Sequence, residues 1–355
     1  MRIKTILKIA GEIRFVKSVL CRYGDSLARG RYYQHNSFRA LSLDEGETRE
    51  KARLYFDKND SGKRMAAIAK KLSSIGYYKN KNKRSTEEYE AFYIANNYDK
   101  KREIKLFSFK NNRILTICTS AEEANKQILQ YERFSGAYNM PRVKKIEKYN
   151  DAFEISMIDL RNFEGEASAF ENICNSTVDN NPNVSVLDIV LAKELIEFSY
   201  DGEIDYYMRK IVDKISPSLM DIRISLCVQH GDLSKENLIY GECEGKLDFW
   251  WIDWEHVGER VFFYDYFFYI INSSLYYNMN AFKSYIAGES DDVLKKMFAH
   301  FALEFNSEKR FDYFLLFTIS FLKERVCSKG GLPVLKTYYE LIEVMEVMLK
   351  ENDIQ

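Results

Sequence analysis

The spacing of apolar residues predicts helices in much of the first hundred residues. Apolar positions in residues 1–40 recur at the interval of a helical turn, which indicates one or two helices with a basic polar face. Such a face is compatible with contact to an anionic membrane surface, or with the solvated back of a helix packed on a core. Further helices are expected over 49–55 and 65–75, and the charged segment 79–90 is expected to be a loop.

A different pattern begins near residue 102, where short apolar runs alternate with turn signals. Ser120 marks the start of a helix that extends to Phe134, because its hydroxyl can cap free amides and the glutamates that follow suit the positive helix end. The segment is therefore predicted as a β-β-α-β-β unit. Its strands are expected over 104–109, 113–118, 141–146 and 153–158.

After residue 160 the pattern becomes mostly helical, so the fold class is predicted to be α+β. The expected helices cover 186–199 and 203–215, with about four more between 261 and 350. Short strands are expected over 222–229, 238–240 and 248–252.

Composition and charge exclude some classes of protein. The chain has 355 residues, of which 46% are hydrophobic and 30% charged, so a wholly disordered chain is excluded. A net charge of −1 gives no case for a nucleic-acid partner. The balance is nevertheless uneven, with 22 basic and 12 acidic residues in 1–100 and 30 basic and 41 acidic residues afterwards.

The start of the chain does not resemble a secretory signal, because Lys4 and Lys8 interrupt its apolar residues. The apolar runs are also too short to span a bilayer. Six scattered cysteines and four histidines form no zinc-type spacing. A cytoplasmic location is expected, with peripheral contact of residues 1–40 at the inner membrane face as an open alternative.

Two polar segments, each following an apolar strand, carry the candidate chemistry. Residues 230–237 read His-Gly-Asp-Leu-Ser-Lys-Glu-Asn, and residues 252–255 read Ile-Asp-Trp-Glu. Asp232, Asn237 and Asp253 offer two carboxylates and one amide oxygen. Hard oxygen ligands of this kind suit Mg²⁺, which takes few protein ligands and completes its shell with water and phosphate oxygens. One carboxylate is left to accept a proton from a hydroxyl group.

The pattern H-G-D-x-x-x-x-N followed by I-D-W-E resembles the aminoglycoside phosphotransferase and choline kinase superfamily, whose members are small-molecule kinases with a protein-kinase-like fold. The resemblance covers roughly 100–355 and is sharpest over 222–270. It implies a two-lobe fold, with a small β-rich N-lobe over 101–160 and a helical C-lobe with the catalytic and metal loops over 161–355. Residues 1–100 would form a basic, mainly helical N-terminal extension.

The resemblance also implies an activity, which is transfer of the γ-phosphate of ATP or GTP to a hydroxyl group. Asp232 would be the catalytic base, and Asn237 and Asp253 would hold Mg²⁺ against the nucleotide phosphates. Glu255 would contact metal-bound water or only fix the loop. The acceptor stays open among a sugar or glycan, an amino alcohol and an aminoglycoside, and the oligomeric state is not indicated.

The remaining residues of the first motif are also candidates for the catalytic segment. His230 is expected to support the loop without taking part in proton transfer. Ser234 lies in the same loop. Lys235 either reaches a phosphate or faces solvent.

The small lobe departs from the family pattern. A lysine on its third strand normally contacts the α- and β-phosphates and pairs with a helix glutamate. Here Thr116 stands at the lysine position as a cofactor-binding candidate, and the glutamate position falls near Gln127, with Lys126 or Glu123 as possible substitutes. The turn at 108–112 has no glycine. A pseudokinase-like binding or regulatory module without turnover is therefore the alternative function.

Overall fold

The computed structural model describes the chain in eight stretches and divides it into two compact units. The described residues are 3–35, 39–56, 78–86, 88–95, 102–146, 149–162, 165–326 and 331–352. The first unit comprises residues 1–136, 140–161 and 241–248, and the second comprises 137–139, 162–240 and 249–355. The helix predicted over 65–75 lies outside the described residues.

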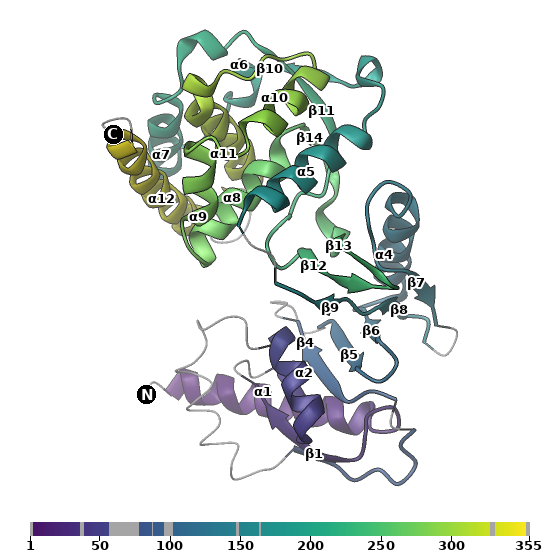
Figure 1. Ribbon diagram of the computed structural model, residues 1–355. Coiled ribbons are helices and arrows are strands. Elements are labelled where there is room, and N and C mark those ends of the chain that lie inside the picture. Colours follow the sequence, from purple (N-terminus) through teal and green to yellow (C-terminus); the bar gives the residue numbers. More distant parts are fainter. Residues whose placement is uncertain are drawn as a thin grey trace. The chain divides into compact units, whose positions relative to one another are not determined.

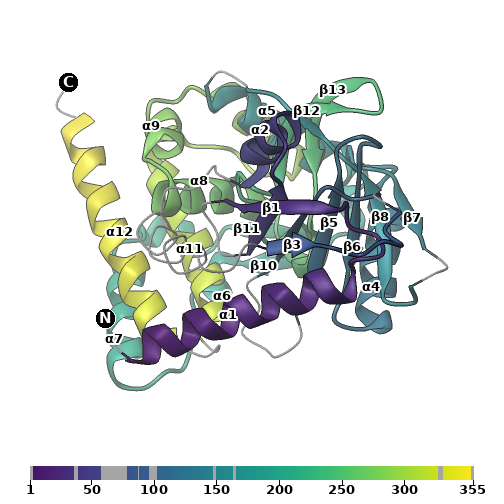
Figure 2. The same ribbon diagram turned by 90° about the horizontal axis from the view of Figure 1, so that it is seen from below.

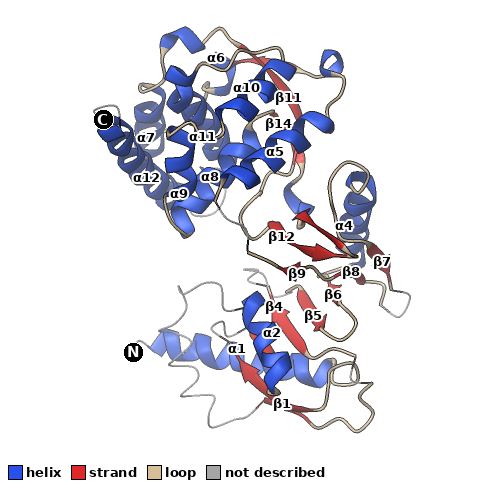
Figure 3. Ribbon diagram, in the orientation of Figure 1, coloured by secondary structure: helices blue, strands red, loops and turns tan. Residues whose placement is uncertain are grey.

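An eight-stranded sheet forms the centre of the first unit (Figure 3). Its strand order is β3-β1-β2-β4-β5-β6-β8-β7, and neighbouring strands are antiparallel. The strands are β1 (Gly30–Gln34), β2 (Ala40–Leu43), β3 (Tyr78–Asn80), β4 (Ala91–Ile94), β5 (Ile104–Ser108), β6 (Arg113–Ile117), β7 (Val143–Lys145) and β8 (Ala152–Ser156).

Helices cover both faces of this sheet. Helix α1 (Ile3–Arg22) lies beside β3 and buries Val16 and Val19 against Leu106 and Leu115 on one face (Figure 2). Helix α2 (Gly46–Phe56) packs its Ala52 against strand residues of the opposite face, among them Phe107. Side chains alternate between faces along a strand, so the core is built on both sides of the sheet.

The predicted β-β-α-β-β unit is confirmed by β5, β6, α4 (Ala121–Phe134), β7 and β8. The hydroxyl oxygen of Ser120 accepts a hydrogen bond from the amide of Glu123 at 3.2 Å, which is the expected helix cap. Glu122 and Glu123 lie in the first turn, where the helix dipole favours negative charge.

Residues 1–100 are less helical than their pattern predicted. Helix α2 is as expected, but α1 ends at Arg22 and the predicted helical range 1–40 also contains β1. In the described part of residues 1–100, strands β2, β3 and β4 follow, and the predicted loop over 79–90 begins within β3. Strand β4 pairs with β5 through Ala91 opposite Phe107, so the sheet continues across the predicted boundary at residue 100. Strands of three to five residues give little periodic signal on their own, because partner strands supply most of their stabilisation.

The second unit is largely helical, as predicted, and the α+β class is confirmed (Figure 3). Its helices are α5 (Ala167–Asp179), α6 (Ala192–Leu195), α7 (Gly202–Val212), α8 (Tyr264–Tyr276), α9 (Asn280–Ile286), α10 (Asp291–His300), α11 (Arg310–Val326) and α12 (Gly331–Asn352). Strands β10 (Ile189–Leu191), β11 (Arg223–Gln229) and β14 (Gly258–Val261) form one small sheet. A further sheet is formed by β13 (Lys246–Trp251), β12 (Leu238–Cys243) and β9 (Asp159–Leu160), of which residues 159–160 and 241–248 belong to the first unit.

The helix predicted over 186–199 is wrong. Ile189 pairs opposite Ser225 in β11, and only the four residues of α6 are α-helical there. Val190 and its branched neighbours favour an extended backbone once a partner strand is available.

Aromatic side chains form the core of the helical unit. Helix α8 packs beside α5, α9 and α11 (Figure 1). Its Tyr264, Tyr266 and Phe267, with Phe262 and Phe263 before it, are at most 1% exposed. These residues are therefore core residues. No helix in the described stretches is long and apolar enough to cross a membrane.

Candidate functional site

The first motif begins where β11 ends, at a tight turn that requires glycine. Gly231 has φ of +82°, a conformation that side chains disfavour. A Cβ at this position would lie 2.3 Å from the main-chain oxygen of His256. The glycine therefore allows residues 230–237 to pass close to the segment that follows β13.

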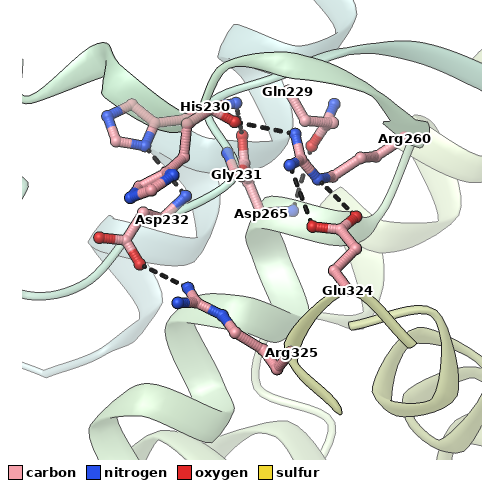
Figure 4. A network of polar contacts seen from close by, with 9 residues as sticks. Gln229, His230, Gly231, Asp232, Arg260, Asp265, Glu324 and Arg325 are labelled. Carbon is pink, nitrogen blue, oxygen red and sulfur yellow. Dashed lines mark hydrogen bonds and ion pairs between the residues drawn. The ribbon is translucent and has the colours of Figure 1, made fainter. Parts of the chain in front are cut away.

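Asp265, at the start of α8, fixes this turn from below (Figure 4). Its carboxylate accepts hydrogen bonds from the amides of His230 at 2.6 Å and Gly231 at 2.9 Å. Its own amide donates to the side-chain oxygen of Gln229 at 3.1 Å. Burial raises the pKa of Asp265 to about 6, and the two amide donors act in the opposite direction. Asp265 thus supports the loop main chain.

The imidazole of His230 connects the two motifs. Its Nε2 lies 2.8 Å from the main-chain oxygen of Ile252, and its Nδ1 accepts from the amide of Asp232 at 3.3 Å. These partners are satisfied together by a neutral ring with its proton on Nε2. Burial lowers the pKa of His230 to about 4, which keeps the ring neutral near pH 7. The ring packs edge-on against Trp254 at a centroid distance of 4.8 Å.

Asn237 is joined to both motifs. Its amide nitrogen donates to the main-chain oxygen of Asp232 at 2.8 Å, so its side-chain oxygen is the atom that can serve a cation. Its main-chain oxygen accepts from the amide of Ile252 at 3.0 Å. Asp253 follows with φ of +67°, a left-handed conformation uncommon for residues other than glycine. Strained backbone of this kind clusters at functional sites.

The carboxylate of Asp232 lies among several charges. Arg325 donates to it at 3.3 Å, and the two side chains are 40% and 34% exposed. Burial raises the pKa of Asp232, His256 and Arg325 act to lower it, and the nearby Asp253 acts to raise it.

Helix α11 brings two charged residues to this site from its last turn (Figure 4). Glu324 accepts two hydrogen bonds from Arg260, each at 3.1 Å, and Arg260 also donates to the oxygen of His256 at 3.0 Å. This paired contact fixes the helix end beside β14. Arg325 follows directly and points toward Asp232.

The other predicted residues of the first motif build or support the loop. The hydroxyl oxygen of Ser234 accepts from the amide of Glu236 at 3.2 Å. Lys235 is paired with the nearly buried carboxylate of Glu166, which also accepts from Tyr269 at 3.0 Å. The Lys235 side chain is thus held by a carboxylate and is 22% exposed.

The donor set around Asp232 fits a hard cation with few protein ligands. In the described stretches no group of three or more His, Cys, Asp or Glu side chains is placed to hold a metal. Mg²⁺ is commonly bound through one or two carboxylates together with water and phosphate oxygens. Asp253 and the amide oxygen of Asn237 match that requirement. Glu255 lies exposed on the short helix η4 (Trp254–His256).

Thr116 belongs to the first unit and is the fourth of the five residues of β6. It is 2% exposed and lies opposite Lys105 of β5 and Phe153 of β8. Gln127, at the predicted glutamate position, is on the buried side of α4, whereas Lys126 is exposed.

Several site residues carry no sequence signal. Glu324 and Arg325 end a long apolar helix, and no motif marks that position. Glu166 is likewise an ordinary charged residue in the sequence. The contacts of these residues join segments that lie 64 to 93 residues apart in the chain.

Comparison with known proteins finds solved structures that are similar to this chain at low sequence identity. No family model matches the sequence, and no curated protein matches it. A choline kinase from Streptococcus pneumoniae is similar at a TM-score of 0.43 with 13% identity, covering 80% of this chain and 99% of that one. An amicoumacin kinase in complex with AMP-PNP and Ca²⁺ is similar at 0.43 with 13% identity, covering 83% and 95%.

A third solved structure, the GDP complex of aminoglycoside 2'-phosphotransferase-IIIa, is similar at a TM-score of 0.40. Its identity is 14%, and the likeness covers 74% of this chain and 94% of that one. TM-scores and sequence identities as low as these establish no shared function. The chemistry assigned to this chain therefore rests on its own contacts.

Proposed function

We propose that this protein is a nucleotide- and Mg²⁺-dependent phosphotransferase that acts on a hydroxyl group of a small molecule. The observation that carries the proposal is the joining of two separated loops. Asn237 bonds to the main chain of Asp232 and to that of Ile252, and His230 contacts the same two residues. The side chains of Asp232, Asn237 and Asp253 are thereby held on adjoining segments.

Each residue has one task in the proposed reaction. Asp232 orients the acceptor hydroxyl and accepts its proton. The acceptor oxygen then bonds to the γ-phosphorus while the bond to the bridging oxygen breaks, and the nucleoside diphosphate leaves. Asn237 and Asp253 hold Mg²⁺ against the nucleotide phosphates, where the cation supplies charge neutralisation. His230 stays neutral and keeps the loops together.

ATP or GTP is the proposed phosphate donor, and the acceptor is a sugar or glycan, an amino alcohol or an aminoglycoside. All of these offer the hydroxyl that a carboxylate base requires. The proposed reaction requires no nucleic acid as substrate or partner.

The experiment is an acceptor screen with γ-labelled ATP and GTP across aminoglycosides, amino alcohols and saccharides, including lipid-linked ones. Wild-type protein should transfer label to at least one acceptor in the presence of Mg²⁺. Asp232→Asn should reduce transfer by about 10³-fold or more, because the proton acceptor is lost. Asp221→Asn is the matched control, since its side chain is 87% exposed and pairs only with Lys193 among the contacts identified. Equal activity of Asp232→Asn and wild type would remove Asp232 as the base.

One observation favours a second candidate, a nucleotide-binding module without turnover. Thr116 replaces the expected phosphate-contacting lysine on β6. Stabilisation of the protein by Mg-ATP, without transfer or hydrolysis across the whole acceptor screen, would support this module.

A further inference from the structure

We propose that Arg325 binds an anionic group of the acceptor, so that the protein selects acceptors with a carboxylate or a phosphate near the reacting hydroxyl. The inference rests on the proposed phosphotransferase function and names the substrate class of the same site. Arg325 and Asp232 both belong to the second unit, and the contacts that carry the inference lie within that unit.

Arg325 lies beside the position that the acceptor hydroxyl must reach. The hydroxyl has to contact the carboxylate of Asp232, because that carboxylate is the proposed base. Nη2 of Arg325 donates to Oδ1 of this carboxylate at 3.3 Å. Figure 4 shows the second carboxylate oxygen turned away from Arg325, so a hydroxyl can approach while the guanidinium stays in place. The part of the acceptor next to the hydroxyl is therefore close to a positive charge.

The guanidinium of Arg325 can bind an anion without leaving Asp232. A guanidinium carries five N–H donors in a planar fork, and Nη2 makes the bond to Asp232. The Arg325 side chain is 40% exposed, so a ligand can reach it. Each hydrogen bond spans about 3 Å, which places an anion on this guanidinium within about 10 Å of a hydroxyl on Asp232. The charge and the hydroxyl thus belong to one small molecule or one sugar unit.

An aromatic ring positions the guanidinium. Phe321 lies one turn earlier on α11, and its ring centroid is 5.4 Å from the guanidinium carbon of Arg325. The ring is 1% exposed and packs edge-on against Tyr338 of α12 at a centroid distance of 5.1 Å. A cation is attracted to an aromatic face, so this fixed ring limits where the guanidinium lies. Holding a charged donor in place before the ligand arrives lowers the entropic cost of binding.

Two other cations beside the loop are engaged by carboxylates that have no part in the proposed reaction. Arg260 donates two hydrogen bonds to Glu324 and is 14% exposed. Lys235 pairs with Glu166 and is 22% exposed. Arg325 is the most exposed of the three cations, and its carboxylate partner is the group that faces the acceptor. It is therefore the cation best placed to contact a ligand.

Carboxylates beside the loop also accept hydrogen bonds from the protein. Glu236 accepts from Tyr277 at 2.9 Å. Glu166 accepts from Tyr269 at 3.0 Å in addition to its ion pair. A cationic acceptor would compete with these donors and would meet the like charge of Arg325, whereas an anionic acceptor meets an opposite charge. Repulsion of the wrong ligand contributes to specificity as much as attraction of the right one.

The test measures kcat/KM of the full chain with γ-labelled ATP or GTP and Mg²⁺ for two matched sets of acceptors. One set is glucose, glucosamine, glucuronate and glucose 6-phosphate, and the other is glycerol, ethanolamine, glycerate and glycerol 3-phosphate. In at least one set an anionic member should exceed the neutral member by about 10- to 100-fold, as expected for a charge-assisted contact. The cationic member should fall below the neutral one. The carboxylate and phosphate members distinguish the two kinds of anion.

Substitutions of Arg325 test whether this residue causes the preference. Arg325→Met should bring the anionic and neutral members of a set to equal kcat/KM, Arg325→Lys should keep the preference, and Arg325→Glu should favour the cationic member. An effect on the base alone is common to all acceptors, so it leaves their ratio unchanged. Arg223→Met is the matched control, because Arg223 is exposed at the opposite end of β11 from the loop. It should keep the wild-type ratio.

The outcomes separate the inference from the proposed function. If wild type transfers phosphate but shows no preference for anionic acceptors, in these sets or among aminoglycosides and choline, the inference is overturned while the proposed function stands. An anion preference that persists unchanged in Arg325→Met overturns it as well. If wild type transfers phosphate to none of these acceptors, both fall together.

Discussion

Arg325, in the last turn of α11, donates a hydrogen bond at 3.3 Å to the carboxylate of Asp232, which lies 93 residues earlier in the chain. The contact places a positive charge beside the group that we propose accepts the hydroxyl proton. Burial raises the pKa of Asp232, and Arg325 acts against that effect. Glu324 and Arg260 fix the helix end from which Arg325 extends.

Replacing Arg325 should therefore change the pH dependence of catalysis. Asp232 must be ionised to accept a proton, so its pKa sets the acidic limb of kcat/KM. Arg325→Met removes a charge that lowers this pKa, and the acidic limb should move to higher pH. Arg325→Lys keeps the charge and should move it less. An acidic limb at the same pH in wild type and Arg325→Met would show that Arg325 does not act on the base.

The turn at Gly231 should tolerate no side chain. Gly231→Ala combines a φ of +82° with a Cβ placed 2.3 Å from the oxygen of His256. We expect a loss of about 2–4 kcal/mol in the free energy of unfolding, and loss of transfer activity as the loop shifts. Gly245→Ala is the control, because its φ is +81° with no atom within 4 Å of the added Cβ.

Denaturant unfolding of both variants measures this difference. Gly245→Ala should cost only the conformational strain, about 1 kcal/mol. Equal costs for the two variants would mean that the close approach to His256 is not a constraint on the loop.

The candidate loops could be predicted from the sequence because their chemistry is local. Asp232 and Asn237 are five residues apart on one loop. The helix cap at Ser120 is local in the same way, because it bonds to the amide of Glu123 three residues later. Arg325 could not be found this way, since only the packing of α11 brings it to Asp232.

Strand pairing explains the wrong prediction over 186–199. Ile189 was predicted in a helix because its partner in β11 lies more than 30 residues later. Its extended conformation depends on this long-range pairing, which single-sequence periodicity does not report.

His230 and Asp265 should give opposite pH dependences of stability. The pKa of His230 falls from 6.5 to about 4 on folding, so its contribution is present above pH 6.5 and is lost as the pH falls to 4. The pKa of Asp265 rises from 3.8 to about 6, so its contribution is present below pH 4 and is lost as the pH rises to 6. Each titration changes the free energy of unfolding by about 3 kcal/mol across its pH range.

Unfolding free energies of His230→Gln and Asp265→Asn, compared with wild type from pH 4 to 7, measure the two effects separately. The advantage of wild type over His230→Gln should shrink toward pH 4. Its advantage over Asp265→Asn should shrink toward pH 7. Differences that stay constant with pH would show that neither group titrates as its burial requires.

Binding of Mn²⁺ in the presence of ATP, followed by electron paramagnetic resonance, tests most directly whether Asn237 and Asp253 hold one cation. Wild type should bind Mn²⁺ and ATP together. Asp253→Asn should weaken that joint binding by about 100-fold or more, since even indirect supports of a metal site are worth 10- to 100-fold. Glu259→Gln, an exposed change on β14, should leave binding unchanged. Equal Mn²⁺ affinity in wild type and Asp253→Asn would contradict the shared cation site.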